Sequence, residues 1–563
     1  MANLTTAKRR RMLQKVSSLD ADSAQEQQLL AGSHTFRPGL RTPEDLLSWP
    51  LDVIQSLCKD PGDEISMRLR HRLLCGIALN TDYSGLDCPR EALEMGMQAL
   101  QHHFEAEPER VPVWVGRTCD KGSIQKKLQR EVSLSCDDDS RCHFEDILDR
   151  LPPESQTWIR AATPDKSLPR EQRAEAFKSI REWLMDNRSW LFPSNATSFC
   201  IVHRRQCLVH PQDPADFAVP VVNQRLRLNV AGVTCHAWSC EGSNEGDAHE
   251  SEIPLAVWIA ERVARFERKE EDMAFLECTP KFPAKEKLGQ AFGDLASVFA
   301  WIDGPEWHGW PHRRTRVLAV VVNTLTLDWH GAQDSDDLKE EYAGRFHRQM
   351  VAAGDLLLQA SEEERVEEMM KIAVARKNNV TMDEMTQIVR LQDYDKLSSL
   401  VFPPGGIQRM QGWIQLYQEK LKETNKLRAF LCDVDHSVGG KGPAGGELWP
   451  TQLTHGSVLS LRQHEDQTTW LLATAKEHLG ALGCRMFGDS PIFPKSKMAT
   501  VLANCDFLPS QVKQLSGNSM HLRTQLAFML FAIGYVSKKK PAGQLHSLTS
   551  WGDDGDSLPH DSL

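Results

Sequence analysis

The stretch that decides the fold is "ALNTDYSGLDCPREALEMGMQAL", residues 78–100. An apolar run ends at an acidic residue, Gly85 permits a tight turn, and Pro89 suits the first turn of a following helix. A strand, a tight turn and a helix in this order bring the amide end of the helix to the end of the strand, where it can hold a nucleotide-like cofactor. Asp82, Tyr83, Ser84, Gly85 and Leu86 are therefore candidates for a cofactor loop, and the alternative is an ordinary tight turn, since SGL-type turns are common.

Five apolar runs have the length of buried strands and are separated by helical patterns: 75–80, 110–116, 226–233, 272–277 and 316–327. This alternation predicts an α/β fold with a mostly parallel sheet. Ligands of such sheets bind beyond the carboxyl ends of the strands, so residues that follow each run are expected to share one surface. Asp120 and Asp146 are two such residues, and each is a candidate ribose or adenine ligand; the alternative for both is a helix cap or a solvated loop.

The third run leads directly into "AGVTCHAWSCEG", residues 231–242. A cysteine at a strand-to-loop turn can be a strong nucleophile, because exposed backbone amides lower its pKa and the turn holds it beside its target. Taken alone, Cys235 is better explained as a buried structural thiol, which is the usual state of an unpaired cysteine.

The stretch around Cys235 resembles the cysteine motif of the DNA (cytosine-5)-methyltransferases, G-x-P-C-Q-x-F-S-x-x-G. Gly232, Cys235, Ser239 and Gly242 match it, Trp238 replaces the aromatic residue, and Thr234 and His236 replace Pro and Gln. The family's other motifs follow in order. "FLECTP" keeps Glu277 of Glu-Asn-Val, "GWPHRRTRVLAV" keeps Arg314 and Arg316 of Gln-x-Arg-x-Arg with His312 at the Gln position, and "VKQLSGNSMHL" keeps Gly517 and Asn518. The sequence of the chain is most similar to those of the divergent methyltransferase-like proteins abundant in dinoflagellates.

The resemblance implies a Rossmann-like class I S-adenosylmethionine-dependent methyltransferase with a helical recognition lobe. The Cys235 thiolate would attack cytosine C6, Glu277 would hydrogen-bond or protonate N3, and Ser239 would support the cysteine loop. Arg314 and Arg316 would hold the base or its phosphate. S-adenosyl-L-methionine would bind the loop at 82–86 together with Asp120, Asp146 and Asn518. DNA is the expected substrate; the alternatives are the same chemistry on RNA, or an impaired methyltransferase-like scaffold or sensor.

The chain is long enough for more than one structural unit. We predict a polar and helical extension at 1–70, a cofactor-binding catalytic domain at 71–330, and a helical insert with the target-recognition lobe at 331–500. Residues 501–536, which include a buried helix, are expected to return to the catalytic domain, and 537–563 to form a disordered tail.

Composition excludes several classes of function. The net charge of −11 argues against indiscriminate binding to nucleic acid, and no apolar stretch is long enough to cross a bilayer. The basic start has no apolar segment after it, so the nucleus or cytoplasm is expected.

The fourteen cysteines include no repeated C-x-x-C pair. The nearest approach to a metal cluster, Cys136, Cys142 and His143, has no fourth ligand at a usual spacing, and we predict no metal site.

Overall fold

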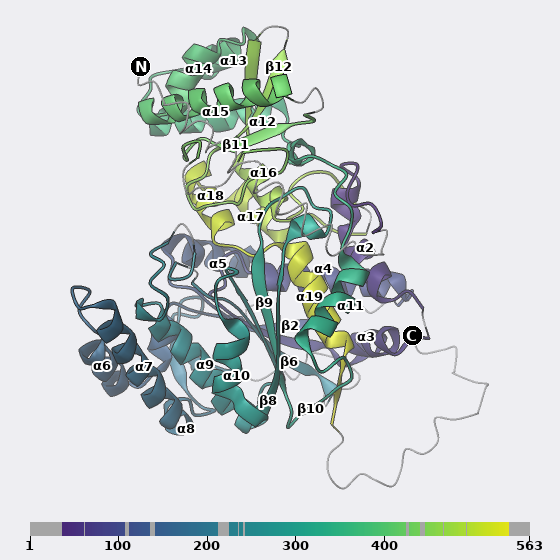
Figure 1. Ribbon diagram of the computed structural model, residues 1–563, viewed down its shortest axis with the longest axis vertical. Helices are drawn as coiled ribbons and strands as arrows, with labels where there is room; N and C mark the ends of the chain where they lie inside the picture. The colour runs from purple at the N-terminus through teal and green to yellow at the C-terminus, as the bar shows by residue number, and fades with distance from the viewer. Residues whose placement is uncertain are drawn as a thin grey trace.

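The computed structural model describes residues 36–539, with gaps at 61, 107–111, 136–140, 212–223, 235, 240–241, 424–426, 440–444, 465–466 and 491, and without the side chains of 134–135 and 503–504. Nearly all of the predicted disordered tail and the first half of the predicted extension therefore lie outside the described residues. The ribbon shows a sheet covered by helices on both faces, and a smaller lobe beyond one end of it (Figure 1). No helix in the described part of the chain combines the length and apolarity needed to cross a bilayer.

The central sheet has nine strands in the order β5-β4-β3-β2-β1-β6-β7-β9-β8. Its strands are β1 (Ile77–Asp82), β2 (Val113–Cys119), β3 (Cys142–Phe144), β4 (Thr197–Cys200), β5 (Arg205–Leu208), β6 (Leu226–Gly232), β7 (Met273–Cys278), β8 (Ala296–Asp303) and β9 (Arg316–Asn323). Strands β3, β2, β1, β6 and β7 are parallel, and the chain winds outward in both directions from β1 and β6. The predicted Rossmann-like, mostly parallel α/β fold is confirmed, and all five predicted runs are strands.

Strand β9 runs antiparallel between β7 and β8. Its first residue, Arg316, therefore lies at the edge of the sheet where the parallel strands end. Gly232 at the end of β6 pairs with Glu277, and Glu277 pairs with Leu318 of β9. Three predicted site segments thus meet at this edge because of strand register alone.

The strand period of two divides the core into two apolar layers. In β7, Met273 and Phe275 face one layer while Ala274 and Leu276 face the other. The first layer is covered by α2 (Asp45–Leu57), α3 (Glu64–Cys75), α4 (Cys88–His103) and α19 (Leu522–Gly534), and α11 (Ser335–Phe346) packs against β8 and α2. The second is covered by α7 (Arg170–Asp186), α8 (Arg188–Leu191), α9 (Glu252–Glu267) and α10 (Ala284–Phe292), with α6 (Pro153–Ala162) outside them.

Helix α19 is the predicted buried helix, and every one of its residues is buried. The ring of Phe528 lies edge-on to Phe275 of β7 with centroids 5.6 Å apart. Close packing against α4 requires a glycine there, because a Cβ added at Gly96 would lie 2.3 Å from Leu526 Cδ1. Beyond α19, β14 (Val536–Lys538) pairs with β10 (Leu327–Trp329).

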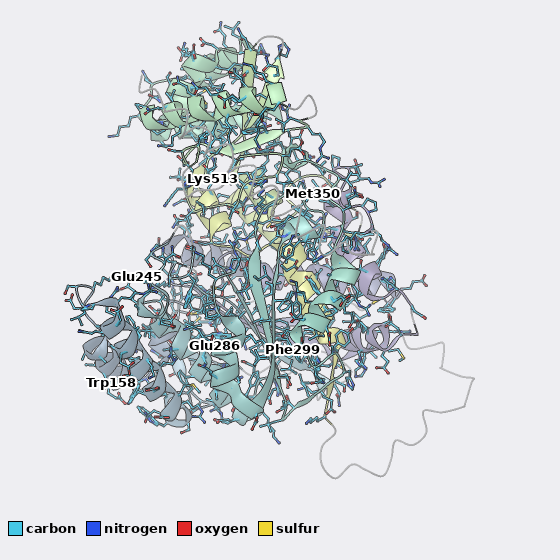
Figure 2. All side chains as sticks on the ribbon, in the orientation of Figure 1. Trp158, Glu245, Glu286, Phe299, Met350 and Lys513 are labelled. Carbon is cyan, nitrogen blue, oxygen red and sulfur yellow. The ribbon has the colours of Figure 1, made fainter. Side chains whose placement is uncertain are left out.

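The lobe beyond the sheet contains α12 (Glu362–Ala375), α13 (Met382–Arg390), α14 (Tyr394–Val401) and α15 (Pro404–Glu423), drawn in green in Figure 1. It also contains a three-stranded antiparallel sheet of β11 (Phe430–Asp433), β12 (Val458–His464) and β13 (Gln467–Leu472), which the helical patterning did not predict. Trp413, Phe430 and Trp470 belong to a core of its own. Helices α16 (Ala475–Ala481), α17 (Lys497–Asn504) and α18 (Pro509–Gly517) connect this lobe to the sheet; Lys513, labelled in Figure 2, pairs with Glu368 of α12 at 3.7 Å.

Candidate active site at the carboxyl edge of the sheet

The predicted cofactor loop is fixed to the end of strand β2. Gly85 has a φ of 52°, a left-handed conformation that glycine adopts without strain. Its amide donates to Asp120 Oδ2 at 2.9 Å, and the Cys119 amide donates to Ser84 Oγ at 2.9 Å. Helix α4 begins directly afterwards with Pro89 in its first turn, as predicted. The structure therefore brings the loop and Asp120 together.

A segment from the far end of the sequence covers this loop. The Leu86 amide donates to Ser519 Oγ at 3.3 Å, and a Cβ added at Gly85 would lie 3.1 Å from the carbonyl oxygen of Asn518. A Cβ added at Gly232 would lie 2.8 Å from Met520 Cε. Met520 thus covers the point between β1 and β6 where the winding reverses, which is the ligand-binding point of open α/β sheets.

Asp82 is turned away from this edge. Its carboxylate, 1% exposed, accepts hydrogen bonds from Arg117 and Arg262 at 3.1 Å each, from Asn229 at 2.9 Å, and from Arg150. Burial raises the pKa of Asp82, but the three guanidinium groups outweigh burial and hold it far below its ordinary value. Glu261 balances the cluster and contacts the same three arginines. In this structure Asp82 stabilises the end of strand β1 through buried ion pairs.

Asp146 caps a short helix, the alternative that the sequence left open for it, and Asp120 accepts two loop amides. Asp120 accepts the amides of Gly85 and Gly122 at 2.9 Å each, and burial outweighs these bonds and raises its pKa. Asp146 accepts the Leu148 amide at 3.0 Å at the start of a short 3-10 helix, Ile147–Arg150. These three bonds leave accepting capacity on both carboxylates, because a carboxylate has about four lone-pair sites.

Tyr83 carries a polar group that fits a ligand at this edge. Its hydroxyl is buried without a hydrogen-bond partner among the described protein groups, and burial raises its pKa well above the ordinary value. A buried hydroxyl at a strand end that keeps its hydrogen-bonding capacity is available to a ligand that binds there. Together with the glycine cradle of Gly85 and the two carboxylates, it suits a nucleoside.

Glu277, Arg314 and Arg316 form one charged cluster. Glu277 Oε1 lies 3.4 Å from Arg316 Nε and 4.0 Å from Arg314 Nε. The Arg314 guanidinium also donates to the Ser519 carbonyl oxygen. The backbone amide of Arg314 donates to Glu306 Oε2 at 3.2 Å. The predicted acid and both predicted arginines are therefore brought together, and Arg314 joins them to the segment that covers the cofactor loop.

Cys235 lies outside the described residues, but the structure describes most of the segment around it. A Cβ added at Gly242 would lie 1.8 Å from the His236 carbonyl oxygen, so the closed loop requires glycine there. Within the loop, the Gly242 amide donates to the Ser239 carbonyl at 3.2 Å. Farther along, Arg173 of α7 donates two bonds to Glu245, at 3.0 and 3.1 Å, and Glu245 is labelled in Figure 2.

Three residues of this edge were missed by sequence reasoning: Glu306, Ser519 and Met520. The sequence offered one signal that could have identified Ser519 and Met520, namely their position beside Asn518.

His312, placed at the Gln position of the arginine motif, is fully buried, and its ring lies 5.8 Å from that of His521. A cavity of about 170 Å³ lies elsewhere, between the start of α2 and residues 483–488, and contains none of the predicted site residues.

No protein-family model and no curated protein matches the sequence. Among solved structures, the chain is similar to Entamoeba histolytica methyltransferase EhMeth (TM-score 0.36, 10% identity, 81% of this chain and 98% of that one). It is also similar to S. pombe Dnmt2 methyltransferase (0.35, 11%, 81% and 98%) and to a mutant of Spodoptera frugiperda DNMT2 (0.33, 9%, 81% and 99%). These TM-scores lie below 0.5, and it is the strand order of the sheet that defines the fold.

Proposed function

We propose that this protein is an S-adenosylmethionine-dependent cytosine-5 methyltransferase that acts on DNA. The observation that supports it most directly is the convergence of Glu277 with Arg314 and Arg316, at 4.0 and 3.4 Å, beside the strand end that leads to Cys235. An acid, two cations and a cysteine loop at the ligand edge of a doubly wound sheet are the groups that this chemistry needs.

The cofactor would be held by Tyr83, the backbone of Ser84–Leu86, Asp120, Asp146 and Asn518. S-adenosylmethionine supplies the methyl group when it is bound. The unpaired Tyr83 hydroxyl and the cradle at Gly85 support this assignment, whereas the ion cluster around Asp82 leaves that residue a supporting role.

The chain's own residues would activate the base. The Cys235 thiolate adds to cytosine C6, and Glu277 shares or donates a proton at N3, so that the negative charge does not remain on the ring. Arg316, at 3.4 Å, orients the Glu277 carboxyl group. Arg314, tied to the Ser519 carbonyl, joins base activation to the cofactor loop. The base must leave its stack to reach such an edge.

The deciding experiment is covalent trapping with a duplex that contains 5-fluorocytosine, in the presence of S-adenosylmethionine. We expect a denaturation-resistant adduct with the wild-type protein and with Cys278→Ala, a neighbouring buried thiol, and none with Cys235→Ala. An adduct that survives Cys235→Ala rules out the nucleophile. The same trapping with 5-fluorocytosine RNA distinguishes the two substrates.

A non-catalytic sensor or scaffold is the second candidate, and one observation favours it. Met520, only 5% exposed, lies over Gly232 at the ligand-binding point of the sheet and narrows the space between β1 and β6. Calorimetry with S-adenosylmethionine, followed by radiolabelled methyl transfer to DNA and tRNA, separates the candidates. Binding without transfer to either polymer favours the sensor, and absence of binding contradicts both.

A further inference from the structure

Four metal-ligating side chains converge at the edge of the sheet formed by β3, β4 and β5. They are Cys142, Cys200, His203 and Cys207, and their ligand atoms all lie within 4.8 Å of one another. None of them belongs to the candidate active site. Strand pleating explains why three sulfurs share one face: Cys200 pairs with Phe144, two residues beyond Cys142, and Cys207 pairs with Ser198, two residues before Cys200.

A hairpin turn supplies the fourth ligand. Strands β4 and β5 are joined by residues 201–204, and Arg204 takes a left-handed φ of 53° there. This tight turn brings His203 back toward the strand face, so its Nδ1 lies 3.3 Å from Cys200 Sγ and 3.5 Å from both Cys142 Sγ and Cys207 Sγ. The His203 amide also donates to Cys200 Sγ at 3.5 Å.

These distances match the edges of a tetrahedron around one metal ion. Bonds of about 2.3 Å to sulfur and about 2.0 Å to nitrogen, at tetrahedral angles, separate each sulfur from the nitrogen by about 3.5 Å. Hydrogen bonding does not account for the arrangement, because one imidazole nitrogen accepts at most one thiol proton and three sulfurs surround it. We propose that Cys142, Cys200, Cys207 and His203 Nδ1 bind one zinc ion.

The chemistry of the donor set selects zinc and a structural role. Three thiolates and one imidazole in tetrahedral geometry suit Zn²⁺, and four protein ligands leave no open position for a substrate. The cysteines are deprotonated on binding, so three protons are released to solvent. The backbone amide of His203 supplies the supporting hydrogen bond that thiolate ligands commonly receive.

The fold explains what the ion stabilises. Strand β3 has three residues and joins β4 through a single residue pair, Phe144 with Cys200. A ladder this short contributes little, whereas a metal bond joins Cys142 of β3 directly to both strands of the hairpin. The predicted trio of Cys136, Cys142 and His143 does not form a site: His143 points to the opposite face, where its Nδ1 bonds Thr118 Oγ1 at 2.8 Å, and Cys136 lies outside the described residues.

The primary test is elemental analysis of the full-length protein purified without chelator. We expect about one zinc ion per chain, and less than about a fifth of that in Cys207→Ser. Cys505→Ser is the matched control, because both thiols are half-buried, and it is expected to keep the ion. Circular dichroism checks that both variants are folded.

Two readouts on the wild-type protein decide the matter even where a variant misfolds. Exchange with Co²⁺ is expected to give the visible bands of a tetrahedral ion and a thiolate charge-transfer band. A strong zinc chelator is expected to lower Tm by more than about 5 °C. A folded wild-type protein that stays free of zinc when zinc is supplied overturns the proposal. So does a Cys142–Cys200 disulfide found by mass spectrometry, or zinc retained by folded Cys207→Ser.

Discussion

Gly85 and Asn518 lie against each other although they stand near opposite ends of the chain: a Cβ added at Gly85 would lie 3.1 Å from the Asn518 carbonyl oxygen. Gly85 also has a φ of 52°, so Gly85→Ala combines a close contact with a strained backbone. We expect a loss of about 1–2 kcal/mol of stability and at least a tenfold weaker S-adenosylmethionine affinity.

Gly289→Ala is the matched control, because nothing lies within 4 Å of a Cβ added there and Gly289 is inside α10. It should leave affinity unchanged and stabilise the protein by up to about 1 kcal/mol. Urea unfolding and calorimetry measure both quantities. Equal affinities of the two variants would contradict a role of this loop in cofactor binding.

Gly242 and Gly232 should respond differently to alanine. An added Cβ at Gly242 would meet backbone, the His236 carbonyl oxygen at 1.8 Å. At Gly232 it would meet the terminal Cε of the Met520 side chain at 2.8 Å, which can shift by rotation about side-chain bonds. We expect Gly242→Ala to abolish adduct formation with 5-fluorocytosine DNA while the protein stays folded, and Gly232→Ala to retain it. Loss of the adduct in Gly232→Ala alone would contradict the assignment of the tighter constraint to Gly242.

Glu277→Gln removes the proton that the proposed chemistry needs at N3. Loss of a general acid commonly costs about 10²- to 10⁴-fold in rate, so methyl transfer should fall by that factor while S-adenosylmethionine affinity is unchanged. Glu286→Gln, an exposed residue of α10 labelled in Figure 2, is the control and should keep full activity. An equal rate in Glu277→Gln and wild type refutes the assignment of Glu277.

The ion cluster around Asp82 predicts an acid-sensitive core. Arg117, Arg150 and Arg262 hold the pKa of Asp82 below its ordinary value, so its stabilising contribution is complete above about pH 4 and is lost as the pH falls further. Asp82→Asn leaves buried arginines uncompensated and should cost about 3–5 kcal/mol. Asp328→Asn, at an exposed pair with Lys539, should cost less than about 1 kcal/mol in the same urea titration.

Buried histidines set a second pH dependence. Burial lowers the pKa of His312, His478 and His521 well below the ordinary value, and neighbouring cations such as Arg314 lower that of His312 further. These three histidines bind protons near pH 6.5 in the unfolded chain but not in the folded protein. Their contribution to the free energy of unfolding is therefore complete above about pH 7.5 and falls as the pH drops below about 6.5.

His312→Asn should reduce this slope by up to about 1.4 kcal/mol per pH unit. The exposed His455, changed to Asn, should leave the slope unaltered. Free energies of unfolding between pH 5 and pH 8 provide the measurement. A slope that is the same in wild type and His312→Asn would mean that His312 binds its proton as readily in the folded protein as in the unfolded chain.

Much of the sheet was predictable because its five central strands are long apolar runs with clear turn signals. Strand β3 was not, since three residues show no periodicity, and β11–β13 follow a long helical pattern that hides the change of structure. The direction of β9 is set by packing between β7 and β8, and the sequence carries no local signal for it.

The candidate site was predictable where spacing carries the chemistry. Glu277, Arg314 and Arg316 come together as expected, and Asn518 reaches the loop at Gly85. The position of Asp82 was visible in the sequence, but its surroundings were not, because Arg117, Arg150 and Arg262 arrive from three separate elements. The roles of Cys235, Asp120 and Asp146 stay predictions.

Helix α19 follows all nine strands of the central sheet in the chain, and every one of its residues is buried. Its residues pack against α4, α3 and α2, which are synthesised long before it, and Leu526 fills the space above Gly96. A nascent chain must therefore keep the apolar face of β1 and α4 exposed until residues 522–534 have been synthesised. This domain cannot complete its core until α19 has emerged, and a chain that ends shortly before α19 would be a client of chaperones and proteases instead of a shortened folded protein.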